Sequence, residues 1–201
     1  MHKCRIMIIP LSVTEKKSGE KIAVLSPKEW YLIRDELNLE YQIRGDFFLY
    51  TGMRIAESYH VAEHPEYFRK ENAAIFLPHV DGLGKKRCTV KQRVITLNAK
   101  GVAAVEEFFS KKVGLAAYQN MGAAFKLAAK KADFDTSLIK TKMFRKTIIS
   151  WLMTVYPNQQ SQISRFAGHD AHTMDNYYLA SGWRKEDKQA MAAELAGWGE
   201  I

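Results

Sequence analysis

One change of hydrophobic period constrains the fold of this 201-residue chain more than any other feature. Apolar residues recur at helical spacing along most of the chain, but two short runs within residues 72–97 have β-type composition. These runs, Ala74–Leu77 and Arg93–Leu97, predict two strands joined by a connection that contains the basic run Lys85-Lys86-Arg87. The pattern predicts a mostly helical domain with a small antiparallel β-sheet (α+β) and a long, positively charged turn.

The other segments predict helices with recognisable ends. Ser26 can cap a helix, Pro27 stands where a missing N–H does no harm, and Glu29 completes a capping box. Pro157 and Gly168 are helix-ending residues. We expect a polar hairpin tip or loop around Gly19 and helices that start near residues 27 and 45 or cover 102–109, 116–132, 144–156, 159–166 and 185–195.

Composition excludes several classes of protein. Hydrophobic residues make up 47% of the chain, which is too many for a disordered protein, and no apolar run approaches the roughly 18–20 residues of a membrane span. The apolar stretch near the start is short and broken by Pro10, unlike a signal peptide. Cys4 and Cys88 alone cannot build a disulfide scaffold or a zinc site, so we expect a cytoplasmic protein in a host cell.

The charge points to a polyanionic partner. Thirty basic residues against 22 acidic ones give a net charge of +8, and the basic runs are spread between apolar helical segments rather than gathered in one tail. Such a surface suits duplex DNA. His60 and His64 have the spacing of one helix face, but Pro65 and the lack of a third nearby ligand favour a surface pair. We expect neither a metal nor a cofactor.

A small set of side chains has the chemistry to act on a phosphodiester. Arg54 stands between a helix end and a helix start, and Lys142 and Arg145 share one helix face because they are three residues apart. His169 and Tyr178 follow, nine residues apart. Two arginines can clamp the phosphate oxygens, a tyrosine can attack phosphorus, and a lysine in the basic turn can protonate the departing 5′ oxygen.

These residues resemble the motifs of the tyrosine recombinase, or phage-type integrase, superfamily. The segment Thr51-Gly52-Met53-Arg54-Ile55-Ala56-Glu57 is similar to the first box, Thr-Gly-x-Arg-x-x-Glu. Lys142 to Arg145 is similar to the second box, His/Lys-x-x-Arg, and Gly168-His169 with Tyr178 to the third. The C-terminal pattern, with Gly197-Trp198 near its end, is most similar to archaeal integrases of viruses and integrated elements.

The resemblance implies a role for each motif residue. Arg54 and Arg145 hold the scissile phosphate, Lys142 and His169 add hydrogen-bond donors, and Tyr178 is the nucleophile. Lys85, Lys86 and Lys91 all qualify as the general acid, and we choose Lys86; Tyr177 is the less favoured neighbour of Tyr178. Lys142 stands where His is commoner and is a poor base, so proton removal from Tyr178 falls to His169 or to water. We interpret Glu57 as structural, holding Arg54 or a backbone N–H.

The resemblance also implies an architecture and an activity. Residues 25–201 form the catalytic domain, residues 1–24 form an arm or linker, and the usual N-terminal core-binding domain is expected to be absent. The expected activity is site-specific recombination through a 3′-phosphotyrosyl intermediate on double-stranded attachment sites, by a homotetramer that is a monomer or weak oligomer when free. The alternatives are a type IB topoisomerase and a non-catalytic duplex DNA-binding protein with the same fold.

Overall fold

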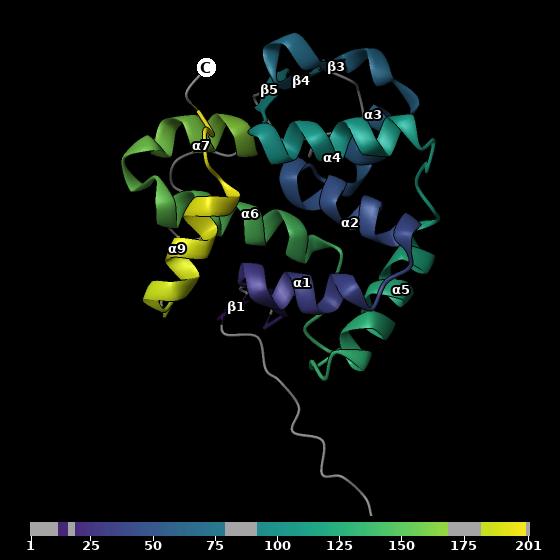
Figure 1. Cartoon of the computed structure of the whole chain (residues 1–201), viewed down its shortest axis with the longest axis vertical. Helices are drawn as coiled ribbons and strands as arrows, with labels where there is room; N and C mark the ends of the chain where they lie inside the picture. Colours follow the sequence, from purple (N-terminus) through teal and green to yellow (C-terminus); the bar gives the residue numbers. More distant parts are fainter. Residues whose placement is uncertain (1–11, 16–18, 79–91, 169–181, 200–201) are drawn as a thin grey trace, which may run out of the picture.

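The structure is a computed structural model that describes residues 12–15, 19–78, 92–168 and 182–199 (Figure 1). Its helices are α1 (Pro27–Asp35), α2 (Leu39–Thr51), α3 (Ile55–Glu63), α4 (Ala99–Ser110), α5 (Tyr118–Lys131), α6 (Lys142–Val155), α7 (Gln160–Ala167) and α9 (Lys185–Glu194). Its strands are β1 (Ser12–Glu15), β2 (Lys21–Val24), β3 (Phe68–Arg69), β4 (Ala74–Leu77) and β5 (Arg93–Thr96). Short 3₁₀ turns occupy Pro65–Tyr67, Lys70–Asn72 and Pro157–Gln159. The chain is mostly helical with small antiparallel sheets, which confirms the predicted fold class.

Two antiparallel sheets flank the helical body. β4 pairs with β5 in the register Ile75 to Ile95, and the short β3 pairs with the other edge of β4, so the strand order is β3-β4-β5. The two predicted strands are therefore confirmed. This three-stranded sheet lies at one end of the body in Figure 1, with α1 and α5 at the other end.

The second sheet is a hairpin of β1 and β2, on either side of the predicted tip around Gly19. β2 packs in the core, ahead of the domain boundary expected at residue 25. Ile22, Ala23 and Val24 are fully buried, and the Ala23 N–H donates to the Leu138 carbonyl at 3.0 Å. The body of the protein thus begins before α1, because this strand is apolar along its whole inner length.

Local signals explain where the helices begin. The predicted capping box of α1 is present: the Glu29 N–H donates to Ser26 Oγ at 3.3 Å, and the Ser26 N–H donates to Glu29 Oε2 at 2.7 Å. α2 starts six residues before the predicted start near residue 45, because the Asn38 side chain accepts the Tyr41 N–H and caps an additional turn and a half. Within the described ranges, none of the helices has the length and apolarity needed to cross a membrane.

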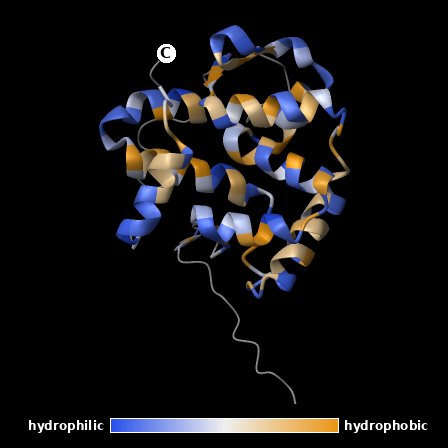
Figure 2. Ribbon diagram, viewed as in Figure 1, coloured by the Kyte–Doolittle hydropathy of each residue, from blue (hydrophilic) through white to orange (hydrophobic). Residues whose placement is uncertain are grey.

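The C-terminal helix is fixed to the body mainly by residues at its end. Figure 2 shows hydrophilic residues along the first turns of α9. Glu194 and Leu195 are buried, and Trp198 packs edge-on against Phe166 at a centroid distance of 5.8 Å. The Trp198 indole N–H also donates to the Thr96 carbonyl at 3.2 Å. The segment after residue 181 is therefore anchored on both α7 and β5.

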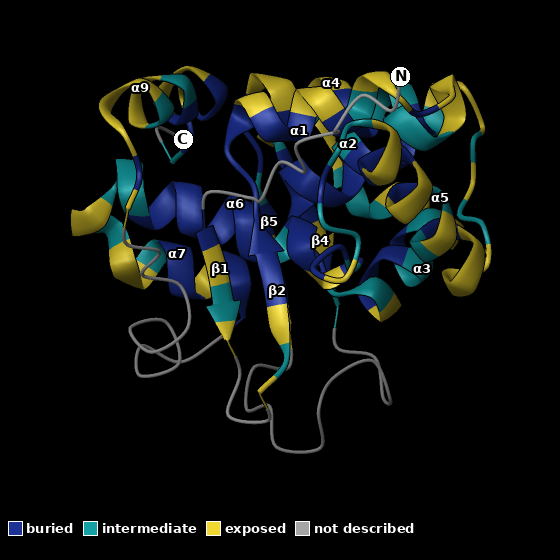
Figure 3. Cartoon of the chain, turned by 90° about the horizontal axis from the view of Figure 1, so that it is seen from below, coloured by how far each residue is buried: buried dark blue, intermediate teal, exposed yellow. Residues whose placement is uncertain are grey.

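α6 is the central helix of the core. Figure 3 colours it as buried over most of its length, whereas α4, α5 and α9 each carry exposed residues. The Phe144 ring contacts Trp30, Phe48 and Phe125, with centroid distances of 4.8 to 5.8 Å. The Trp151 indole N–H donates to the Leu25 carbonyl at 2.7 Å. This packing gives α6 a fixed position, and with it Arg145, which projects from the same helix.

Candidate active site

Arg54 is positioned by the break between α2 and α3. Gly52 ends α2 in the left-handed region at φ 56°, and a Cβ at this position would lie 2.9 Å from both Ile148 and Phe166. Only glycine fits this tight turn without displacing the core. Arg54 then takes the N-cap position of α3 in an extended conformation. The Thr-Gly-x-Arg pattern thus has a direct structural cause.

A buried carboxylate holds Arg54 in place. Glu57 is 4% exposed and accepts the Arg54 backbone N–H at 2.7 Å through Oε2. Its Oε1 accepts from Arg54 Nη1 at 2.7 Å, and its Oε2 also accepts from Arg93 Nη2 at 2.5 Å. Glu57 therefore holds both the Arg54 side chain and a backbone N–H, which confirms the structural role expected for it. One carboxylate serves two guanidinium groups, which leaves this group of side chains positively charged.

Three arginines meet at the C-terminal end of α7, and we call Arg54, Arg93 and Arg145 the arginine cluster. Arg93 Nη1 donates to the Ala167 carbonyl at 2.7 Å, and Arg145 Nη2 donates to the same oxygen. Arg54 Nη2 donates to the next carbonyl, that of Gly168, at 2.9 Å. The last carbonyls of a helix lack partners within it and carry partial negative charge. The end of α7 therefore orients the whole arginine cluster.

Arg145 is also tied to the first motif. Its Nη1 donates to the Gly52 carbonyl at 2.6 Å, so the turn that positions Arg54 positions Arg145 as well. The structure thus brings together the two arginines that the sequence analysis selected, although they are 91 residues apart in the chain.

Exposure separates the roles of the three arginines. The Arg54 side chain is 24% exposed and Arg145 is half-buried, whereas the Arg93 side chain is only 6% exposed. A guanidinium carries five N–H donors in a planar fork that matches the oxygens of a phosphate. Arg54 and Arg145 can therefore bind an anion from outside, while Arg93 supports Glu57 from within.

Gly168 lies directly against the arginine cluster. It ends α7 in the left-handed region at φ 57°, and a Cβ there would lie 2.6 Å from Arg93 Nη1. Any larger residue would both strain the backbone and push Arg93 away from the Ala167 carbonyl. The glycine of the Gly-His motif is thus required by the arginines that pack against it.

The other predicted site residues are not all brought to this cluster. Lys142 is the first residue of α6 and is exposed, and it lines a cavity between α5 and α6 that no member of the arginine cluster lines. Lys86, His169, Tyr177 and Tyr178 lie outside the described residues.

Arg93 belongs to the arginine cluster, although the sequence analysis did not select it. It alternates with Ile95 along β5, and both are buried while Val94 between them is exposed. A charged residue in the inward register of a strand must have a buried counter-charge. The inward position of Arg93 in the predicted strand could therefore have identified it. The sequence analysis used the segment only as evidence for a strand and did not ask what its arginine would face.

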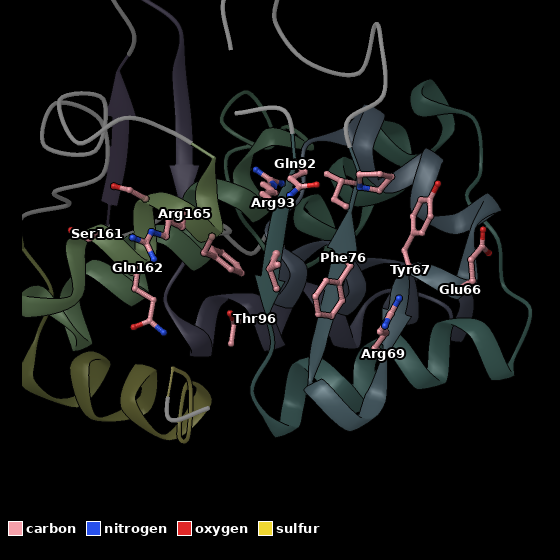
Figure 4. A pocket seen from close by; sticks show the side chains of 15 residues that line it. Glu66, Tyr67, Arg69, Phe76, Gln92, Arg93, Thr96, Ser161, Gln162 and Arg165 are labelled. Atoms are coloured by element: carbon pink, nitrogen blue, oxygen red, sulfur yellow. The ribbon is translucent and has the colours of Figure 1, made fainter. Parts of the chain in front are cut away.

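A cavity of about 1050 Å³ extends from Arg93 across the outer face of the sheet (Figure 4). Ser161 and Arg165 of α7 lie on one side of it, and Tyr67 and Arg69 on the other. Its floor is partly apolar, and the Arg69 guanidinium lies 5.1 Å from the centroid of the Phe76 ring. This surface therefore places cationic and aromatic groups beside the arginine cluster.

The histidine pair is not part of a metal site in the described part of the chain. The His60 and His64 rings lie 4.6 Å apart, and His64 Nδ1 is 2.8 Å from Glu66 Oε1. Among the residues that the structure describes, no group of three or more potential ligands could hold a metal ion.

Comparison with known proteins gives matches in structure alone. No protein-family model and no curated protein matches the sequence. The crystal structure of XerA recombinase matches with a TM-score of 0.60 and 12% identity, over 87% of this chain and 63% of that chain. The Tn1549 transposon integrase in complex with circular intermediate DNA matches with a TM-score of 0.61 and 16% identity, over 87% of this chain and 67% of its own.

A second Tn1549 integrase structure, in complex with transposon right end DNA, matches with a TM-score of 0.61 and 15% identity, over 86% of this chain and 65% of its own. The chain spans about two thirds of the length of these proteins. Identities this low establish a common architecture and no shared mechanism. The chain has the fold of tyrosine recombinase catalytic domains.

Proposed function

We propose that this protein is a DNA strand transferase that cuts and rejoins duplex DNA as a site-specific recombinase or integrase. One observation carries the proposal: Arg54 and Arg145 are held side by side on the end of α7, with buried Glu57 and Arg93 behind them. Such a paired, partly exposed and pre-oriented set of guanidinium groups suits a phosphodiester that gains negative charge in its transition state.

The proposed chemistry is a transesterification at phosphorus. Arg54 and Arg145 bind the non-bridging oxygens of the scissile phosphate, and Lys142 and His169 add hydrogen bonds. The phenolic oxygen of Tyr178 forms a bond to phosphorus as the bond from phosphorus to the 5′ oxygen breaks. The tyrosine proton passes to His169 or water, and the 5′ oxygen takes a proton from Lys86. The free 5′ hydroxyl of a partner strand reverses the step, so the phosphodiester is conserved.

Duplex DNA is the proposed partner. The net charge of +8 favours a polyanion, and the two integrase structures with the same fold contain DNA. Strand exchange between two duplexes requires four active sites, so we propose a homotetramer on DNA. An archaeal virus or integrated element as the source, and a cytoplasmic site of action, belong to the same proposal.

A covalent-trapping assay tests the chemistry. Purified protein is incubated without metal on nicked duplexes, both with candidate attachment sites and from a random pool, and is then denatured. Wild type is compared with Tyr178→Phe, Tyr177→Phe and Arg145→Ala. Arg165→Ala serves as a matched control, because this exposed arginine lies on α7 but makes none of the contacts of the arginine cluster.

The expected result is a denaturation-resistant adduct that is lost in Tyr178→Phe and Arg145→Ala and kept in Tyr177→Phe and Arg165→Ala. Loss in Tyr177→Phe alone would reassign the nucleophile. The absence of an adduct from every variant, with duplex binding intact, would identify a non-catalytic DNA-binding protein. Relaxation of supercoils at random sites, without exchange between attachment sites, would favour the topoisomerase alternative.

A further inference from the structure

Trp198, near the end of the chain, contacts both of the elements that carry or orient the arginine cluster. It is 3% exposed, and its ring lies edge-on to the Phe166 ring of α7. Its indole N–H donates to the Thr96 carbonyl of β5 at 3.2 Å. In Figure 1 the segment after α9 accordingly runs beside α7. One buried side chain thus joins α7 and β5 to the C-terminal segment.

Phe166 connects Trp198 to Arg145. Phe166 is 2% exposed and directly precedes Ala167, whose carbonyl accepts from Arg145 Nη2. A Cβ at Gly52 would lie 2.9 Å from the Phe166 ring, so this ring also packs against the turn that ends α2. The Gly52 carbonyl accepts from Arg145 Nη1 at 2.6 Å. The two carbonyls that hold Arg145 therefore belong to the residue after Phe166 and to the turn that Phe166 contacts.

The hydrogen bond to β5 reaches the arginine cluster by a second route. Thr96 is the last residue of β5 and Arg93 is the first. Arg93 Nη2 donates to Glu57 at 2.5 Å, and Glu57 accepts from Arg54 Nη1 at 2.7 Å. The bond from Trp198 thus fixes the end of a short strand whose other end carries part of the cluster.

Packing makes the position of α7 depend on the Trp198 ring. Removing a large ring from a packed interior leaves space that the surrounding groups fill only in part. Phe166 would shift towards that space and take the adjacent Ala167 carbonyl with it. The guanidinium groups that this carbonyl orients would move as well. A displacement of about 1 Å at a reacting site can slow a reaction about 10²-fold.

We propose that Trp198 is a positioning residue for strand transfer. By packing on Phe166 and binding β5, it keeps the end of α7 where the last carbonyls of the helix orient Arg54 and Arg145 on the scissile phosphate. The part of this inference that concerns the reaction rests on the proposed function. The C-terminal segment, on this account, stabilises the geometry of the active site as well as the fold.

The test compares two substitutions of Trp198 with a matched control. Trp198→Leu removes the ring and its N–H, whereas Trp198→Phe keeps an aromatic ring beside Phe166 and loses only the bond to β5. Met191→Ala is the control, because Met191 is fully buried in the same C-terminal segment but lies on α9, which packs on α1 and α6. Trp198→Met, with a flexible side chain that fills part of the space, repeats the test where Trp198→Leu does not fold.

Adduct formation on one nicked duplex is measured with protein in excess, at a temperature where every variant is folded. The dependence on protein concentration gives a limiting rate and a half-saturating concentration. Trp198→Leu should lower the limiting rate about tenfold to a hundredfold and change the half-saturating concentration less than about twofold, because orientation matters most in the transition state. Trp198→Phe should stay within about threefold of the wild-type rate.

Met191→Ala should melt at a lower temperature than wild type but keep the wild-type limiting rate. A wild-type limiting rate in Trp198→Leu would overturn the proposal, since Trp198 would then only anchor the C-terminal segment. The same loss of rate in Met191→Ala would overturn it as well, because any weakening of that segment would then slow the reaction.

Arginine side-chain NMR of the free, ¹⁵N-labelled protein separates this inference from the proposed function. Trp198→Leu should shift the Nε–Hε resonances of Arg93 and Arg145. The resonance of Arg44, whose Nε donates to the Gly114 carbonyl at 3.0 Å, should stay in place. These shifts in a protein that forms no adduct would remove the recombinase function and keep the positioning by Trp198. An adduct in wild type, with unshifted Arg93 and Arg145 resonances in Trp198→Leu, would do the reverse.

Discussion

Two buried glutamates, Glu57 and Glu194, show how one kind of group can serve either a site or a fold. Glu57 is 4% exposed and Glu194 is 7% exposed. Glu57 binds the guanidinium groups of Arg54 and Arg93. Glu194 accepts from Tyr50 Oη at 2.5 Å and pairs with Lys100 Nζ at 2.8 Å. Burial and charge alone do not distinguish the two residues.

The difference lies in what their partners do next. Arg54 binds Glu57 through Nη1 and the Gly168 carbonyl at the end of α7 through Nη2, and its side chain is partly exposed. Glu57 therefore orients a cation that an outside ligand can reach. Tyr50 and Lys100 belong to the body, and Glu194 ties α9 to them. Burial tends to lower the pKa of Lys100, but its pairing with Glu194 outweighs this and raises that pKa. Glu57 therefore orients Arg54, which the proposed function places on the scissile phosphate, whereas Glu194 holds the C-terminal helix.

The largest predicted effect follows from Glu57→Ala. The substitution leaves two buried or half-buried arginines without their carboxylate, so the free energy of unfolding should fall by about 3–5 kcal/mol. Urea denaturation of the free protein measures this loss. The double variant Glu57→Leu with Arg93→Met removes both charges of the most buried pair and should recover part of the stability. Wild-type stability of Glu57→Ala would show that Glu57 does not hold the arginine cluster.

Gly168→Ala should have the next largest effect. It places a Cβ in the left-handed region and against Arg93, so we expect a loss of about 2–4 kcal/mol and little adduct. Gly114→Ala is the matched control, because Gly114 has φ 61° with nothing within 4 Å of a Cβ, and should cost about 1 kcal/mol. Thermal unfolding of both variants gives the comparison. Equal losses of stability would show that the contact with Arg93 does not contribute to the effect of Gly168→Ala.

Glu194→Gln tests the other half of the comparison. It removes the charge that Lys100 and Tyr50 bind, so the free energy of unfolding should fall by about 1–2 kcal/mol. The amount of trapped adduct should stay at the wild-type level at temperatures where the variant is folded. A folded Glu194→Gln protein that forms no adduct would contradict the separation of the two glutamates.

The smallest effect concerns alkaline pH. Burial, and then the hydrogen bond to Glu194, raise the pKa of Tyr50 above its ordinary value near 10. The unfolded chain therefore loses this proton first, so the contribution of Tyr50 to stability is full below about pH 10 and declines as the pH rises further. Between pH 9 and 11 the wild type should lose about 1 kcal/mol more than Tyr50→Phe. Urea denaturation at each pH measures the free energy of unfolding of both proteins. The same pH dependence for wild type and Tyr50→Phe would exclude this linkage.

Local patterns in the sequence predicted most of the fold. The capping box at Ser26, the strands predicted over 74–77 and 93–97 and the helix end at Gly168 depend on a few neighbouring residues. Each is confirmed, with the second strand ending one residue earlier, at Thr96. The place of β2 in the core was not predicted, because its burial depends on contact with Leu138 and with α6, far along the chain.

The site was predictable in part for the same reason. The spacing of the motifs selected Arg54, Arg145 and Glu57, and the structure brings these residues together. Arg93 has no motif of its own, since its role depends on which distant groups face it. The alternation along β5 places Arg93 on the inward side, but only the folded chain shows that Glu57 and the Ala167 carbonyl are its partners.

A double-mutant cycle on Arg54 and Arg145 tests the central claim most directly: that the arginine cluster presents two guanidinium groups to one phosphate. The rate of adduct formation on one nicked duplex is measured for wild type, Arg54→Ala, Arg145→Ala and the double variant. Each single substitution should slow the reaction about 10²-fold or more, and the double variant should be much faster than the product of the two losses predicts, because the residues act as a unit. Fully multiplicative losses, or a wild-type rate in either single variant, would contradict the account.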